Sequence, residues 1–254
     1  MFKSLNKDKL LTIGILPLMW FLYFLFELFT GRVKTLYDAI LNLSLLILFI
    51  FTGWIIYIVA KKYPKGINSK ALWILFITFM ILDQGIKLII KFNFFESFVE
   101  IIPDFLFFNP IINSQGSWIN ARFNLSANFP LLITSNFIFL FFLIEIYRYG
   151  LSKNIKNFWS DMSFIFIISG ALCSLIDKVF YGGSLDFIGI SNLFIADIKD
   201  IYINLGLFFF IMFIYKEDYL KDDDSTSFKD DWLEIKKFLS FVKSDIFKIK
   251  KEKA

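Results

Sequence analysis

The stretch SGALCSLIDKVFYGGSLDFIGISNLFIADIK, residues 169–199, passes from a run of apolar residues to a group of carboxylates. Its acidic side chains are Asp177, Asp186 and Asp197, and a short glycine-containing loop is expected around the second of them. A charged side chain costs about 2.5–3.5 kcal/mol at the bilayer centre, so an acid within or beside a membrane span generally serves a function. The stretch therefore predicts both a membrane helix and a site of chemistry.

The composition indicates a polytopic membrane protein. Of 254 residues, 57% are hydrophobic and 36 are Phe, which is more apolar surface than a soluble domain of this size needs. Several apolar segments reach the roughly 20 residues that cross a bilayer. Six spans are predicted, at residues 10–29, 39–60, 71–90, 131–147, 162–180 and 198–215. The predicted fold class is mainly α, with a small ordered extracytoplasmic region between the third and fourth spans.

Basic residues predict the orientation of these spans. Lysines surround Pro64 after the second span, and Arg148 and two lysines follow the fourth. Such basic loops stay in the cytoplasm, so both termini are expected there and Asp186 and Asp197 on the extracytoplasmic side. The net charge of +4 comes from lysines between apolar runs, which fits attraction to anionic membrane lipid and not a nucleic-acid surface.

Three parts are predicted along the chain: an N-terminal transmembrane hairpin at 1–63, a four-helix membrane domain at 64–216, and a cytoplasmic tail at 217–254. The tail starts with an acidic linker at 222–227 and continues with apolar residues at helical spacing among lysines. This pattern favours a basic amphipathic helix on the inner leaflet, and a partly disordered lysine tail is the alternative. Hairpin and tail are the segments available to bind lipid or another membrane protein.

The residues that the chain lacks narrow its chemistry. Without histidine, Ser-His-Asp and Cys-His nucleophilic sites and His-ligated zinc are excluded. With one cysteine, Cys173, no internal disulfide can form, and this residue is expected to be a small buried side chain. Carboxylates, lysine and serine remain for catalysis, and neither a cofactor nor a metal is expected.

Asp186 and Asp197 are the first candidate site. Two neighbouring carboxylates tend to share one proton, so the ionised one can activate a water while the protonated one polarises a peptide carbonyl. Asp197 stands where the sixth span begins, and a helix N-terminus favours a carboxylate. The alternative is two acids that cap helix ends in water.

Two pairs with helical spacing are further candidates. Asp83 and Lys87 lie on one face of a span and can form an ion pair, either as a purely structural pair or at the border of the site. Ser174 and Lys178 offer a nucleophile and its base. The second pair is the weaker candidate, because a lysine near the membrane surface has little reason to lose its proton.

Five segments in order resemble lipoprotein signal peptidase, the type II signal peptidase of bacteria. They are DQGIK (83–87), IPDFLFFNPIIN (102–113) running into Gly116, SGALCSLIDK (169–178), SLDFI (184–188) and FIAD (194–197). The resemblance covers about residues 71–216. It implies an intramembrane aspartyl endopeptidase that uses water as its nucleophile. Such enzymes cleave signal peptides from diacylglyceryl-modified prolipoproteins at the outer face of the inner membrane.

The resemblance also implies roles for individual residues. Asp186 and Asp197 match the catalytic dyad of the family. The residues with implied supporting or substrate-binding roles are Asp83, Lys87, Asn113, Gly116, Ser174, Asp177 and Lys178, of which Ser174 and Lys178 replace an asparagine and an arginine.

Other positions depart from the family pattern. Phe194 replaces an asparagine, and Lys199 follows the dyad where the family has a small residue. Lys199 is expected to be able to pair with a dyad carboxylate and remove its proton. Two hypotheses follow: a divergent aspartyl endopeptidase, and a catalytically impaired relative that binds lipoproteins or another membrane partner without cleavage.

Overall fold

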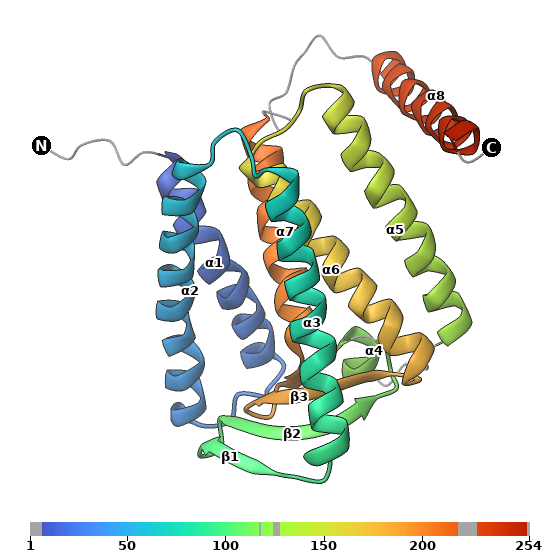
Figure 1. Cartoon of the computed structure of the whole chain (residues 1–254). Coiled ribbons are helices and arrows are strands. Elements are labelled where there is room, and N and C mark those ends of the chain that lie inside the picture. Colours follow the sequence, from blue (N-terminus) through green and yellow to red (C-terminus); the bar gives the residue numbers. More distant parts are fainter. Residues whose placement is uncertain (1–6, 117, 124–127, 218–227, 253–254) are drawn as a thin grey trace, which may run out of the picture.

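The computed structural model describes residues 7–116, 118–123, 128–217 and 228–252 (Figure 1). Six helices in this part of the chain are long and apolar enough to span a membrane. They are α1 (Lys7–Phe29), α2 (Leu36–Lys62), α3 (Ser69–Asn93), α5 (Phe129–Ser152), α6 (Phe158–Phe180) and α7 (Ile198–Lys216). Each predicted span coincides with one of them, so the prediction of a mainly α, multi-pass membrane protein is confirmed.

Polar side chains determine where five of these helices begin. Thr35, Asn68, Asn128, Asn157 and Asp197 each accept a hydrogen bond from a backbone N–H in the first turn of the following helix. These amides have no partner within their helix, so a side-chain oxygen satisfies them. Asp197 therefore sits at a defined point, directly before α7.

A four-stranded antiparallel sheet lies across one end of the helix bundle, which we call the sheet end (Figure 1). Its strands, in spatial order, are β1 (Val99–Ile102), β2 (Leu106–Asn113), β3 (Ser184–Ile190) and β4 (Phe194–Ala196). The pairing of β2 with β3 joins the segment after α3 to the segment after α6. In this register Asn113 lies opposite Ser184, and Ile111 lies opposite Asp186.

The prediction of a loop around Asp186 is wrong, because Asp186 lies inside β3. Leu185, Asp186 and Phe187 are buried in succession, so both faces of this strand are covered. A strand covered on both faces lacks the alternation of apolar and polar residues that reveals a half-exposed strand. The glycines near it then suggest a loop in the sequence.

Close contact between α6 and α7 forms the centre of the bundle. A Cβ added at Gly206 would lie 2.6 Å from Ile167 Cγ1 and 3.0 Å from the Ile167 backbone nitrogen. Gly170 faces α7 in the same way, with Ile203 Cγ1 2.7 Å from its added Cβ. Small residues let helix backbones approach in a membrane, where packing drives association. The adjoining core residues are Leu16, Leu72, Phe158, Trp159, Met162, Ile165, Phe208, Phe209 and Met212.

The N-terminal hairpin packs against the sheet end. The Phe194 ring in β4 lies 5.6 Å from the Tyr23 ring and 6.3 Å from the Trp20 ring, both in α1. Arg32, between α1 and α2, donates a hydrogen bond to the backbone carbonyl of Asn192 in the β3–β4 turn. The hairpin thus supports the strand that leads into Asp197.

The tail forms a helix, α8 (Phe228–Glu252), which contacts the end of α5 away from the sheet. Arg148 donates a 2.8 Å hydrogen bond to Asp245, and the Tyr149 ring lies 5.5 Å from the Phe238 ring and 5.3 Å from the Phe241 ring. The expected acidic linker lies outside the described residues. A short helix, α4 (Trp118–Phe123), follows β2. The division into three parts stays a prediction.

We predict that Gly206→Ala lowers the melting temperature of the purified protein in detergent. The added methyl group overlaps Ile167, and overpacking of this kind costs about 1–3 kcal/mol. The matched control is Gly14→Ala in α1, where an added Cβ meets nothing within 4 Å. Equal melting temperatures for the two variants would show that close α6–α7 packing does not limit stability.

Candidate active site

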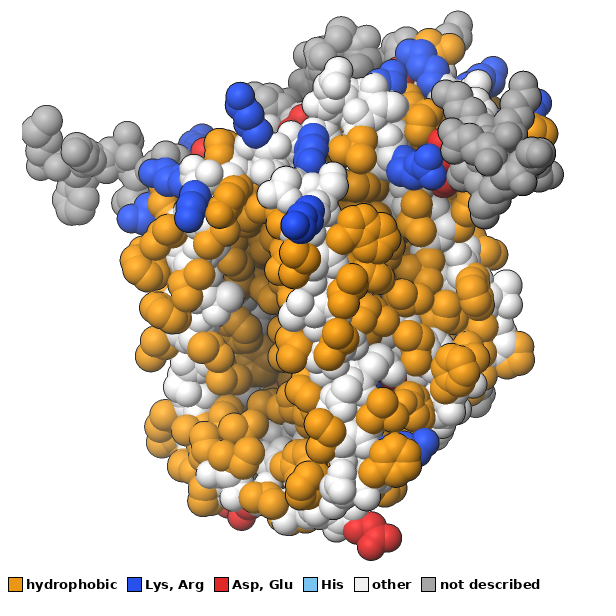
Figure 2. Space-filling model, in the orientation of Figure 1, with side chains coloured by type: hydrophobic (Ala, Val, Ile, Leu, Met, Phe, Trp, Pro, Cys, Tyr) orange, Lys and Arg blue, Asp and Glu red, His pale blue; other side chains and the backbone are white. Residues whose placement is uncertain are grey.

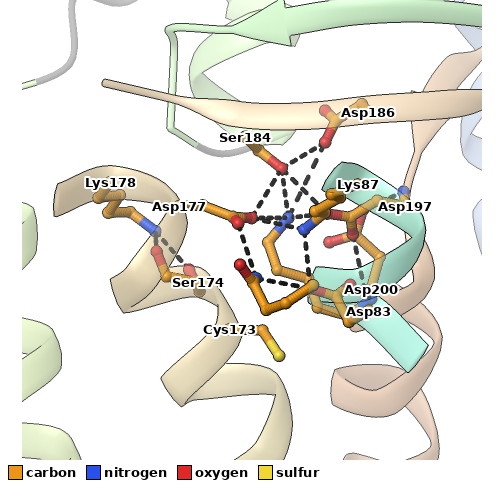
Figure 3. A network of polar contacts seen from close by, with 12 residues as sticks. Asp83, Lys87, Cys173, Ser174, Asp177, Lys178, Ser184, Asp186, Asp197 and Asp200 are labelled. Atoms are coloured by element: carbon orange, nitrogen blue, oxygen red, sulfur yellow. Dashed lines mark hydrogen bonds and ion pairs between the residues drawn. The ribbon is translucent and has the colours of Figure 1, made fainter. Parts of the chain in front are cut away.

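Acids and lysines gather where the sheet meets the ends of α3, α6 and α7 (Figure 3). We call this group the carboxylate cluster. It consists of Asp83, Gln84, Lys87, Asn113, Asp177, Ser184, Asp186, Asp197, Lys199 and Asp200. Its charged members come from four separate elements, so the fold assembles the cluster from distant parts of the sequence.

Lys87 is at the centre of the cluster and is fully buried. Its Nζ lies 2.9 Å from Asp83 Oδ2, 2.7 Å from Asp177 Oδ2 and 2.6 Å from Asp197 Oδ2. A buried ammonium is stable only when carboxylates and hydrogen bonds surround it. The contact therefore holds the ends of α3 and α6 against the start of α7.

Asp83 and Gln84 complete this arrangement. Asp83 Oδ1 accepts a 3.0 Å hydrogen bond from the backbone N–H of Lys199, in the first turn of α7. Gln84 Nε2 donates to Asp83 Oδ2 at 2.9 Å and to Asp177 Oδ1 at 3.1 Å. The ion pair expected between Asp83 and Lys87 is thus part of the cluster.

Asp186 faces the cluster from β3. Residues two apart on a strand share a face, so Ser184 and Asp186 point the same way. Asp186 Oδ2 accepts a 2.9 Å hydrogen bond from Asn113 Nδ2, and Oδ1 lies 2.5 Å from Ser184 Oγ. Burial raises the pKa of Asp186 above its usual range, against the opposing effect of Lys199. Of the two acids, this one has the greater tendency to keep a proton.

The pKa of Asp197 is shifted in the opposite direction, toward the ionised carboxylate. Burial alone would raise its pKa, but Lys199 and Lys87 outweigh that effect and hold the pKa of Asp197 below its usual range. Its Oδ1 accepts from the backbone N–H of Asp200 at 3.2 Å as the cap of α7. Carboxylate oxygens of Asp186, Asp197 and Asp200 lie within 4.8 Å of one another. Two neighbouring carboxyl groups with pKa values moved apart are suited to act as acid and base.

The positive charge in this acidic group comes from lysine. Three carboxylate oxygens within 4.8 Å meet the spacing that a cation requires. The Nζ of Lys199, however, contacts Asp197 and lies 3.8 Å from Asp186 Oδ1. We therefore consider the cluster as an acid–base site.

Three predicted site residues lie outside the cluster. Lys178 donates to the carbonyl and the hydroxyl of Ser174, and Figure 3 shows this pair apart from the carboxylates. Gly116 adopts a left-handed backbone, with φ of 75°, in the turn after β2. Cys173 is buried, as expected, and its Sγ lies 3.6 Å from the Met80 sulfur.

Gln84, Ser184 and Asp200 are cluster members that the sequence did not reveal as such, and Lys199 was expected only to disturb the dyad. Gln84 lies within the DQGIK segment and Asp200 lies three residues after Asp197. The signal for Ser184 is its position two residues before Asp186, which has meaning only once the segment is known to be a strand.

Comparisons with known proteins agree with this architecture. No curated protein matches the sequence. A solved structure described as "Bacterial membrane enzyme structure by the in meso method at 2.3 A resolution" is 23% identical, with a TM-score of 0.52 over 65% of this chain and 99% of its own. A second, described in the same words at 1.9 A, is 24% identical with a TM-score of 0.50, over 63% and 98%. At these identities the likeness concerns the fold.

A match to a family model shows which family the chain belongs to, which the structural likeness alone does not. The family described as "Signal peptidase (SPase) II" matches residues 74–216, which is more than half of the chain. All members of the carboxylate cluster lie within this range. The chain therefore belongs to the signal peptidase II family.

Proposed function

We propose that this protease is an aspartyl endopeptidase that cleaves signal peptides from diacylglyceryl-modified prolipoproteins, with Asp186 and Asp197 as its catalytic pair. Membership of the signal peptidase II family makes the chain a protease of the type that acts on lipoprotein signal peptides. The observation that carries the catalytic assignment is the closeness of two buried carboxylates whose pKa values move in opposite directions.

The proposed mechanism assigns different roles to the two acids. Asp197, held as a carboxylate by Lys87 and Lys199, accepts a proton from the attacking water. Asp186 donates its proton to the carbonyl oxygen as the water adds. When the C–N bond breaks, Asp197 passes the proton that it took from the water to the leaving amine, and Asp186 recovers its own proton from the hydroxyl of the intermediate. Asn113 holds Asp186 in place through its 2.9 Å hydrogen bond. Asp83 and Asp177 position Lys87, so they act through it.

The substitutions at 174, 178 and 194, where the chain departs from the family pattern, leave Asp186 and Asp197 in place. Ser174 and Lys178 bind each other outside the cluster. Phe194 packs against α1 and makes an apolar contact in place of a polar one. The hypothesis of an impaired relative depended on the substitutions at 174 and 194 and on the added elements at both ends of the chain, and the comparisons give it no support.

We further propose a bacterial inner-membrane location with both termini in the cytoplasm. Figure 2 shows Lys and Arg side chains gathered at the end of the molecule opposite the sheet, an apolar belt below them, and acidic side chains at the sheet end. Basic residues favour the cytoplasmic side, so the cluster faces the extracytoplasmic surface. This is where a secreted prolipoprotein would present its cleavage site.

α8 suits a position on the inner leaflet. It exposes apolar side chains together with Lys236 and Lys237, and its other face packs on α5. The exposed apolar residues are Trp232, Leu233, Ile235, Leu239, Ile246 and Phe247. An apolar face beside lysines binds the boundary between headgroups and acyl chains of an anionic membrane.

Asp186→Asn and Asp197→Asn should each lower cleavage of a lipidated prolipoprotein by about 10²–10⁴-fold, since each removes a group that transfers a proton. The measurement is the rate of signal-peptide release in membranes or lipid nanodiscs. Asparagine is as good a helix cap as aspartate, so α7 should keep its start in the Asp197 variant.

Asp104→Asn is the matched control, because Asp104 is an exposed acid in the β1–β2 turn at the same end of the molecule. It should cleave at the wild-type rate. A wild-type protein as inactive as the two dyad variants would refute the proteolytic function. Dyad variants as active as wild type would refute the assignment of the pair.

Cysteine labelling tests the orientation. In a Cys173→Ala background, Asp104→Cys in the β1–β2 turn should react with a membrane-impermeant maleimide in intact spheroplasts. Lys65→Cys, in the exposed α2–α3 loop, should react only after lysis. The reverse pattern would place the cluster on the cytoplasmic side and contradict the proposed location.

A further inference from the structure

Lys199 brings a second ammonium into the cluster. Its side chain starts in the first turn of α7 and is only 6% exposed. Its Nζ contacts Asp197 Oδ2 and Ser184 Oγ, and lies 3.3 Å from Asp177 Oδ2 and 3.8 Å from Asp186 Oδ1. One buried cation therefore lies beside both members of the proposed catalytic pair.

Ser184 lies between the two carboxylates. Its Oγ is 2.5 Å from Asp186 Oδ1 and 3.0 Å from Asp197 Oδ2. A hydroxyl has one hydrogen and two acceptor positions, and an ammonium only donates. Ser184 therefore accepts from Lys199 and donates to one carboxylate at a time.

The charges around the hydroxyl determine the direction of its hydrogen bonds. Asp197 contacts two ammonium groups, those of Lys87 and Lys199, and so remains ionised. Asp197 Oδ2 lies 3.0 Å from Ser184 Oγ and is nearer than Asp177 Oδ2 at 3.3 Å, so Ser184 donates to Asp197. It then accepts a hydrogen bond from protonated Asp186, which gives a continuous path from the acid through the hydroxyl to the base. The directions of the two pKa shifts agree with this assignment.

All charged or titratable groups near Lys199 bear on this balance. Those that interact with Lys199 or the pair are Asp83 and Lys87 from α3, Asp177 and Lys178 from α6, and Asp200 and Tyr202 from α7. Lys87 forms ion pairs with Asp83, Asp177 and Asp197. Lys199 is the ammonium that lies next to both Asp186 and Asp197.

We infer that Lys199 is a positioning residue that fixes the division of labour within the pair. Its Nζ contacts Asp197 but lies 3.8 Å from Asp186 Oδ1, so it stabilises ionised Asp197 more than ionised Asp186, and the proton of the pair stays on Asp186. This inference rests on the proposed function of the pair as an aspartyl protease site. It assigns a constructive role to a lysine that the sequence alone indicated as a disturbance.

Lys199→Met tests the inference through the pH dependence of cleavage. The lost positive charge stabilised both carboxylates in their ionised forms, so each should keep its proton to higher pH. Both limbs of the pH–rate profile should move upward by about 1 pH unit or more, as expected for an opposite charge removed from contact distance. Lys199→Arg retains the charge and should leave the limbs near their wild-type positions.

Lys91→Met is the matched control, because it removes a lysine at the same end of α3 whose Nζ lies over the Tyr181 ring, outside the cluster. Its profile should equal that of wild type. Lys199→Gln repeats the test if the Met variant does not fold, because glutamine is neutral yet can still donate to Ser184. The inference would be overturned if the pH–rate profiles of the neutral Lys199 variants had both limbs at the wild-type pH values. A higher rate at an unchanged pH optimum would overturn it as well.

A second readout separates this inference from the proposed function. Infrared titration follows the carbonyl stretch of protonated carboxyl groups and needs no turnover. Loss of the Lys199 charge should shift the carboxyl titration that Asp186→Asn abolishes. An inert wild type whose titration still shifts would refute the proteolytic function alone, whereas an active wild type with no shift would refute the role of Lys199 alone.

Discussion

The contact of the Lys87 ammonium with three carboxylates is the interaction on which the site depends. Asp83, Asp177 and Asp197 come from three different helices, and this lysine contacts all three of them. Removal of one partner from a buried ion pair typically costs about 3–5 kcal/mol, because the remaining charge is left without compensation. The same contact that orients Asp197 therefore also holds the helices together.

The sheet provides the second carboxylate of the pair, Asp186. Helix ends bring Asp197 and Lys87 together, but the second carboxylate must approach from outside the bundle, and β3 carries Asp186 across the ends of α3, α6 and α7 (Figure 3). Pairing with β2 adds Asn113 next to Asp186. The N-terminal hairpin supports β4 through Phe194, so even the helices outside the family match stabilise the approach to Asp197.

Much of this could be predicted from the sequence, for identifiable reasons. Long apolar runs have one stable solution in lipid, so the six spans and the start of α7 at Asp197 followed from composition and capping. The strand at Asp186 did not, because residues buried on both faces carry no alternation. The roles of Ser184 and Lys199 depend on which side chains meet across the sheet and α7, and spacing along one chain does not contain that information. For the same reason Ser174 and Lys178 remained candidates until the structure showed them apart from the cluster.

The spacing of Asp83 and Lys87 also bears on how the protein is made. The two residues lie one turn apart in α3, so they can neutralise each other within a single helix before their other partners have been synthesised. A lone charge within a span would hinder entry of α3 into the bilayer, whereas a paired one is tolerated. Asp177 and Asp197 are synthesised later than α3. Lys87 can then form ion pairs with them in addition to its contact with Asp83. The Asp83–Lys87 ion pair is thus the first contact of the cluster that can form during synthesis, and it lets α3 enter the membrane.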